Sequence, residues 1–147
     1  MKLLLISQYF PPENGAAAER MKAYADFFDQ HTALEVMTPV PGHMLLNEET
    51  PPQDFRFTVN RISLKKKSSN GNSQRLAHEI SFALKVAKKL YAEYDDTLCI
   101  FTTPSPFLAM VALALKKIKK RPYILDVRDL YPQVIAEAGL LSKKNPI

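Results

Sequence analysis

The sequence has only one cysteine and only short apolar runs. The lone thiol, Cys99, excludes an internal disulfide and fits a reducing compartment. Because Cys99 lies in the apolar run Leu98–Phe101, we interpret it as a core residue and not as a catalytic thiol. The run from Lys2 to Ile6 is too short for a signal peptide, and the run from Pro106 to Leu115 is about half a membrane span. We therefore expect a cytoplasmic protein that is soluble, or peripheral at the inner face of the plasma membrane.

Glycine is also scarce, and the motifs of several enzyme classes are missing. Gly15 stands alone after the first apolar run, so the chain lacks the G-x-G-x-x-G pattern of a dinucleotide-binding loop. This argues against a nicotinamide enzyme or another Rossmann oxidoreductase, including a nucleotide-sugar epimerase. No P-loop and no Ser–His–Asp arrangement appears. The three histidines lack the spacing of metal ligands, so we expect no zinc site.

Acidic residues are missing from one long stretch of this basic chain. The formal net charge is +5, and the segment from Phe55 to His78 holds six Arg or Lys and no acid. A second basic cluster comprises Lys116, Lys117, Lys119, Lys120 and Arg121. These clusters are either solvated loops and helix ends or a surface for anionic lipid or a phosphate-bearing partner. They are not interleaved with aromatic residues on a recognisable motif, so we expect no nucleic-acid partner.

What the chain does contain is an alternation of short apolar runs and amphipathic stretches. We predict strands over Lys2–Ser7, Ala33–Thr38, Phe55–Leu64, Thr97–Thr102 and Pro122–Val127. We predict helices over Ala16–Gln30, Gln74–Tyr91 and Phe107–Lys119, and the start of another over Val134–Leu141. This alternation predicts an α/β fold with a mainly parallel sheet in a Rossmann-like three-layer domain, its strands ordered 3-2-1-4-5.

The helices differ in how clearly they show a buried face. The helix from Gln74 to Tyr91 has the clearest apolar face, which we expect in the core. That face consists of Leu76, Ile80, Ala83, Leu84, Ala87, Leu90 and Tyr91. The first helix places Ala17, Met21, Tyr24, Ala25 and Phe28 on one face. The helix from Phe107 to Lys119 is almost uniformly apolar, which predicts burial on more than one side.

Three loops are expected to meet at the carboxyl ends of the strands, where sheets of this kind bind ligands. They span Gln8 to Gly15, Thr102 to Pro106 and Arg128 to Gln133. In the first loop, Asn14, Gly15 and Ala16 open a helix, where free N–H groups and the positive end of the dipole favour a phosphate.

The other two loops supply side-chain chemistry. Thr103 and Ser105 offer hydroxyl groups at a second helix start, and Arg128 and Asp129 place a cation beside a carboxylate. Each feature has a structural alternative: Gly15 as a simple turn, Thr103 and Ser105 as helix caps, and Arg128 paired with Asp129.

Two of these stretches together resemble a known enzyme family. The stretch Lys2–Glu13 with Gly15, Glu19 and Arg20, combined with Asp126–Gln133, is similar to the N-terminal half of bacterial retaining glycosyltransferases. These are the GT-B enzymes of the glycosyltransferase 4 / group 1 family, which build capsule, O-antigen and exopolysaccharide. The resemblance covers the whole chain.

The resemblance implies the N-terminal, acceptor-side half of a GT-B fold, here residues 1–147. It implies a C-terminal domain, absent from this chain, that holds the nucleotide-sugar donor, and an acceptor that is a glycan or a lipid-linked glycan. The main chain at Gly15 and Ala16 would approach the donor diphosphate. Arg128, which stands where many members have His, would stabilise negative charge or orient the acceptor beside Asp129. Neither a required metal nor another cofactor is implied.

The end of the sequence fits this expectation, because residues 139–147 do not resemble a finished C-terminus. A fragment of this kind is not expected to turn over alone. The alternative is a non-enzymatic flavodoxin-like or receiver-like ligand-binding module. Such a module would need an acidic pocket or flavin-stacking aromatics at the strand ends, and the sequence predicts neither.

Overall fold

The chain is described here by a computed structural model, over residues 2–41, 54–64, 72–103 and 105–128. Its strands are β1 (Lys2–Ile6), β2 (Ala33–Pro39), β3 (Thr58–Ile62), β4 (Thr97–Thr102) and β5 (Tyr123–Asp126). Its helices are α1 (Ala16–Asp29), α2 (Asn72–Glu93) and α3 (Pro106–Lys119). The predicted helix over Val134–Leu141 lies outside the described residues.

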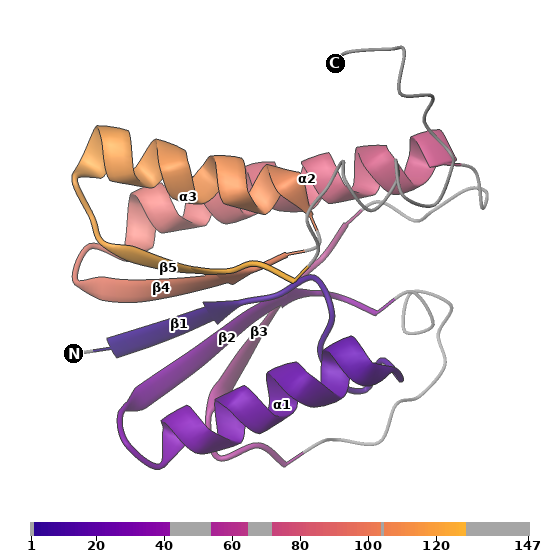
Figure 1. The fold of residues 1–147 in the computed structure, drawn as a ribbon, viewed down its shortest axis with the longest axis vertical. Coiled ribbons are helices and arrows are strands. Elements are labelled where there is room, and N and C mark those ends of the chain that lie inside the picture. The colour runs from indigo at the N-terminus through magenta and orange to yellow at the C-terminus, as the bar shows by residue number, and fades with distance from the viewer. Residues whose placement is uncertain (1, 42–53, 65–71, 104, 129–147) are drawn as a thin grey trace.

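The strands form one five-stranded sheet in the order β3-β2-β1-β4-β5, and every adjacent pair is parallel. Helices α2 and α3 cover one face and α1 covers the other, so the domain is a Rossmann-like three-layer α/β fold (Figure 1). The predicted strand order is confirmed. The chain builds outward from β1 to β2 and β3, then crosses to the other side of β1 to add β4 and β5. Because each crossover is right-handed, this change of direction places α1 on one face and α2 and α3 on the other.

The central strand β1 supplies the core on both faces, because alternate side chains point to opposite sides of a sheet. Leu4 and Ile6 pack into the cluster beneath α2 and α3, whereas Leu3 and Leu5 pack into the cluster beneath α1. Cys99 lies in the first cluster, and its burial raises the pKa of the thiol to about 11. The interpretation of Cys99 as a core residue is therefore confirmed.

The prediction of the buried face of α2 is wrong for four of its seven residues. Leu76, Ile80, Leu84 and Tyr91 are exposed, and the buried face consists of Phe82, Ala83, Val86 and Leu90. The apolar residues of this helix cover more than one face, so their spacing alone does not select the face that meets the sheet. The predicted burial of Phe107–Lys119 on several sides is also wrong, since Met110, Leu113 and Ile118 of α3 are exposed.

The strand β3 is shorter than predicted. Pairing begins at Thr58, and the two aromatic residues before it, Phe55 and Phe57, pack beside Phe10 without joining the ladder. Phe55, Phe57 and Val59 all belong to or pack against the cluster beneath α1, as alternate residues of an extended segment can.

Candidate functional site

A cavity of about 400 Å3 opens at the carboxyl ends of β1, β4 and β5. Its lining comes from the first two of the three predicted loops, from Arg128 at the start of the third, and from α1. The lining residues are Ser7, Gln8, Tyr9, Ala17, Arg20, Met21, Thr102, Thr103 and Arg128. Their convergence follows from the parallel register, in which Ile6 pairs with Phe101 and Thr102 pairs with Asp126.

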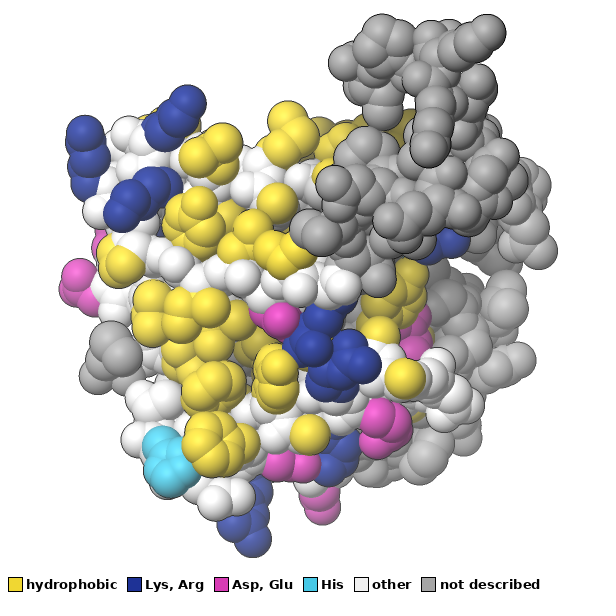
Figure 2. All heavy atoms as spheres, in the orientation of Figure 1, with side chains coloured by type: hydrophobic (Ala, Val, Ile, Leu, Met, Phe, Trp, Pro, Cys, Tyr) yellow, Lys and Arg dark blue, Asp and Glu magenta, His cyan; other side chains and the backbone are white. Residues whose placement is uncertain are grey.

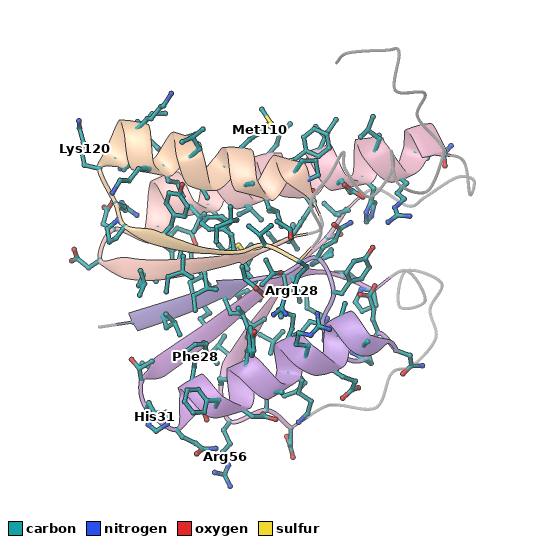
Figure 3. All side chains as sticks on the ribbon, in the orientation of Figure 1. Phe28, His31, Arg56, Met110, Lys120 and Arg128 are labelled. Carbon is teal, nitrogen blue, oxygen red and sulfur yellow. The ribbon has the colours of Figure 1, made fainter. Side chains whose placement is uncertain are left out.

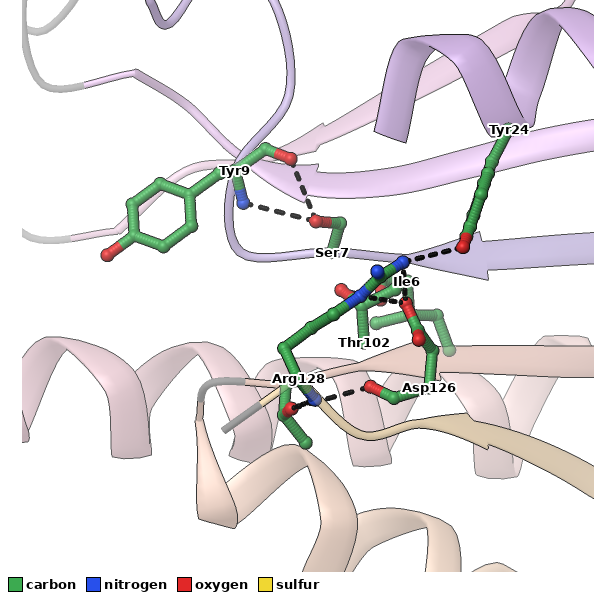
Figure 4. A network of polar contacts seen from close by, with 8 residues as sticks. Ile6, Ser7, Tyr9, Tyr24, Thr102, Asp126 and Arg128 are labelled. Atoms are coloured by element: carbon green, nitrogen blue, oxygen red, sulfur yellow. Dashed lines mark hydrogen bonds and ion pairs between the residues drawn. The ribbon is translucent and has the colours of Figure 1, made fainter. Parts of the chain in front are cut away.

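Arg128 is the most firmly held charged group in this cavity. Its Nε donates to Oδ2 of Asp126 at 2.7 Å, and its Nη2 donates to the hydroxyl of Tyr24 at 2.6 Å (Figure 4). The guanidinium also lies over the Tyr24 ring, 5.3 Å from its centroid. These contacts join the end of β5 to the middle of α1, so the guanidinium is positioned without a ligand.

The same contacts fix the charge of Arg128. Burial acts to lower the pKa of this guanidinium, but its hydrogen bonds to Tyr24 and Asp126 outweigh burial and raise the pKa above its ordinary value. Arg128 therefore remains a cation at every physiological pH and cannot act as a general base.

Thr103 holds the main chain of Arg128. Its Oγ1 accepts a hydrogen bond from the Arg128 N–H at 2.8 Å and donates to the Asp126 carbonyl at 3.4 Å, while its own N–H donates to that carbonyl at 3.1 Å. The Thr103 side chain thus lines the cavity and clamps β4 to the chain after β5. It is not the helix cap that the alternative interpretation proposed.

Buried aromatic contacts and a hydrogen bond hold the loop that follows β1. Phe10 is fully buried and packs against Phe55 and Phe57, with ring centroids 5.4 and 6.3 Å away. Arg61 of β3 donates from Nη2 to the Pro11 carbonyl. Gln8 is also buried, and its Oε1 has no hydrogen-bond partner among the described residues. A buried acceptor without a partner is costly, and this one belongs to a residue that lines the cavity.

The structure separates the predicted site residues into two groups. Thr103 and Arg128 line the cavity together, whereas Asn14, Gly15 and Ala16 are exposed and precede Ala17, the first lining residue of α1. Gly15 has φ 133° and begins α1, a conformation that strains any other residue although no atom would contact its Cβ.

One further predicted residue lies outside the lining of this cavity. Ser105 stands at the N-cap of α3, but its hydroxyl makes no capping bond, is buried, and does not line the cavity. Asp129 lies outside the described residues. The sequence suggested that Arg128 could pair with Asp129, whereas among the described residues its guanidinium pairs with Asp126, two residues earlier.

Several residues of this site were not predicted from the sequence, among them Gln8, Arg20, Tyr24 and Asp126. Arg20 and Tyr24 are four residues apart in a helix and so share a face, and that spacing was the available signal. Asp126 and Arg128 are two residues apart in an extended segment, which places their side chains on the same side. Tyr24 was assigned only to the apolar face of its helix.

A second cavity, of about 460 Å3, lies between α1 and the segment before β3. Its charged lining mixes Lys22, Asp26, Asp29, Asp54 and Arg56. It holds no strand-end residue, and Lys22 and Asp26 already pair with each other at 2.6 Å. The first cavity differs in its charge. None of the described residues that line it is acidic, and two of them, Arg20 and Arg128, are basic. Its geometry and charge suit an anion with hydrogen-bond donors.

A scan of the chain against protein-family models gave no match, and a search of curated proteins gave none either. What the site can do is therefore inferred from its own residues. Among the described residues, no group of histidine, cysteine and carboxylate side chains could hold a metal ion.

Proposed function

We propose that the cavity binds the diphosphate of a nucleotide-sugar, and that the chain is the acceptor-side domain of a retaining glycosyltransferase with a GT-B fold. The reaction would transfer the sugar to a glycan or lipid-linked acceptor in surface-polysaccharide synthesis. The observation that carries the proposal is the Arg128 guanidinium, fixed by Asp126 and Tyr24 in the same cavity as Arg20. The enzyme class is proposed because stretches within residues 2–20 and 126–133 resemble retaining glycosyltransferases with a GT-B fold.

The chemistry required of such a site is the stabilisation of negative charge. When the bond between the sugar and the diphosphate breaks, charge develops on the leaving phosphate. Arg128 is permanently cationic and already oriented, so its electrostatic contribution requires no rearrangement. Gln8 could accept a hydrogen bond from a hydroxyl of either substrate. Asp129 is proposed to act on the acceptor side, and the second domain to hold the rest of the donor.

The proposal is tested by titrating uridine diphosphate and inorganic pyrophosphate into the full chain and measuring heat or spectral change. We expect saturable binding that weakens as salt rises. Replacing Arg128 with Ala should lower the affinity by about tenfold to a hundredfold, because a charge-assisted hydrogen bond contributes roughly 1.5–3 kcal/mol. The matched control is Arg56→Ala, an exposed arginine that lines only the second cavity.

Equal binding by the wild type and the Arg128→Ala variant would refute the placement of the site. Transfer itself is measured as incorporation of labelled sugar into a lipid-extractable product, with the proposed C-terminal domain present. Titration with flavin mononucleotide distinguishes this function from that of a flavodoxin-like module, because such a module would bind flavin mononucleotide and would not bind pyrophosphate.

A further inference from the structure

Exposed apolar side chains are concentrated on one layer of the molecule. Of the ten large apolar side chains that are exposed in the described part of the chain, seven lie on α2 and α3. They are Leu76, Ile80, Leu84, Tyr91, Met110, Leu113 and Ile118. The two helices lie side by side and contact each other (Figure 1), and Met110 points away from the sheet (Figure 3). We call the solvent-exposed side of these two adjacent helices the α2–α3 face (Figure 1).

Several of these side chains expose more than half of their surface to solvent. Leu84, Met110 and Ile118 expose 66%, 64% and 68% of their surface. Single exposed apolar residues are ordinary, but a set gathered on two adjacent helices marks an interaction surface.

Lysines are interleaved with the apolar residues on the same face. Lys88 lies one turn after Leu84 on α2, and Lys117 lies one turn after Leu113 on α3. Lys88, Lys116, Lys117 and Lys120 are exposed, and among the described residues none of them has an ion-pair partner. Figure 2 shows part of this arrangement, with hydrophobic side chains over α3 and basic side chains where the helix ends.

The net charge of this layer is positive. Between residues 74 and 121 the sequence has nine Lys or Arg against four Asp or Glu. The helix α3 itself contains no acid, and its last turn holds Lys116, Lys117 and Lys119. Asp95 is already engaged by Lys119 and Arg121.

We propose that the α2–α3 face binds the surface of an anionic lipid bilayer. Apolar side chains of such a face enter the boundary between headgroups and acyl chains, and interleaved lysines reach outward to the phosphates. A protein partner fits less well, because lysine is depleted in the centre of protein interfaces. A second copy of the chain fits less well still, because it would bring the same cationic layer against itself.

The α2–α3 face is separate from the cavity, which lies at the carboxyl edge of the sheet. Among the described helices, none is long and apolar enough to cross a membrane. The proposed contact is therefore one that lies on the bilayer, and its strength depends on both apolar insertion and charge.

The test is sedimentation of the full chain with phosphatidylcholine vesicles that do or do not contain phosphatidylglycerol. We expect binding only to the anionic vesicles. The double variant Lys116→Gln, Lys117→Gln should bind about thirtyfold more weakly, because each lysine near an anionic surface contributes roughly fivefold. Leu113→Ser should weaken binding by about tenfold.

The matched controls lie on the opposite side of the sheet. Arg56→Gln removes an exposed positive charge, and Phe27→Ser removes an exposed apolar side chain of α1. Both should bind as the wild type does, and circular dichroism should show the same helix content in all variants. Three results would overturn the proposal: no vesicle binding, an equal loss of binding in the controls, or a dimer in solution that Leu113→Ser disrupts while vesicle binding is absent.

Discussion

At the scale of single residues, the site depends on one arginine that three elements position. Asp126 fixes Arg128 from β5, Tyr24 fixes it from α1, and Thr103 fixes its main chain from the end of β4. An arginine held in this way loses little side-chain entropy when an anion arrives, because the ordering has already occurred. Arg20 is exposed, and the described part of the chain shows no comparable hydrogen bonds holding it.

Removing a single hydroxyl should expose this positioning role. In Tyr24→Phe the ring remains beneath the guanidinium, but the hydrogen bond of 2.6 Å is lost. We expect pyrophosphate affinity to fall by about threefold to tenfold, since one hydrogen bond to a charged group is lost while the guanidinium itself stays. The melting temperature should change little. Tyr91→Phe, on the α2–α3 face, is the control, and an equal effect there would contradict the role given to Tyr24.

At the scale of elements, α2 shows how a helix can be apolar on two sides for two reasons. Phe82, Val86 and Leu90 meet the sheet and are fully or almost fully buried, whereas Leu84 and Tyr91 face outward. Burial stabilises the fold, and the exposed row contributes little to it. The exposed row therefore needs an explanation outside the fold, and the proposed bilayer contact supplies one.

Two leucines of α2 allow a direct comparison of these two faces. We expect Leu90→Ala to lower the free energy of unfolding by about 2–5 kcal/mol, because it leaves a cavity in the core beneath α2 and α3. Leu84→Ala should change it by less than about 0.5 kcal/mol, as surface substitutions usually do. Urea denaturation measures both. If Leu84→Ala were as destabilising as Leu90→Ala, the exposed row would belong to the core after all.

At the scale of the whole molecule, a buried carboxylate ties the elements together at the amino end of the sheet. Glu35 of β2 accepts hydrogen bonds from Asn60 of β3 and Tyr94, and forms an ion pair with Lys2 of β1. Burial acts to raise the pKa of Glu35, but the contacts with Lys2, Tyr94 and Asn60 outweigh it and lower this pKa. Burial and the Glu35 charge raise the pKa of Tyr94.

This network predicts how stability depends on pH. Because the pKa of Glu35 is lower in the folded chain, its contribution is present above the unfolded pKa of about 4.3 and is lost as pH falls through the folded value. At neutral pH, Glu35→Gln should lower the free energy of unfolding by about 1–3 kcal/mol, and the difference should shrink as the pH falls below about 4.3. Urea titrations across this range measure it. Asp96→Asn, an exposed acid, is the control, and a constant difference at all pH values would argue against the ion pair.

The fold class could be predicted from the sequence. Continuous apolar runs such as Leu3–Ile6 are typical of buried parallel strands, their alternation with helices indicates a doubly wound sheet, and 3-2-1-4-5 is a common strand order for such a sheet. The sequence also indicated which strand ends meet, because parallel strands share their carboxyl edge, and so placed Thr103 near Arg128.

Two features depend on tertiary packing and could not be predicted from the sequence. They are the side chains that complete the site and the face of α2 that is exposed to solvent. The partners of Arg128 come from residues 24, 103 and 126, and such contacts depend on side-chain reach across layers and not on sequence spacing. The buried row of α2 was likewise chosen by the position of the sheet, since helical periodicity leaves several apolar rows equivalent. Gln8 became a binding candidate only once packing had buried its carbonyl oxygen without a partner.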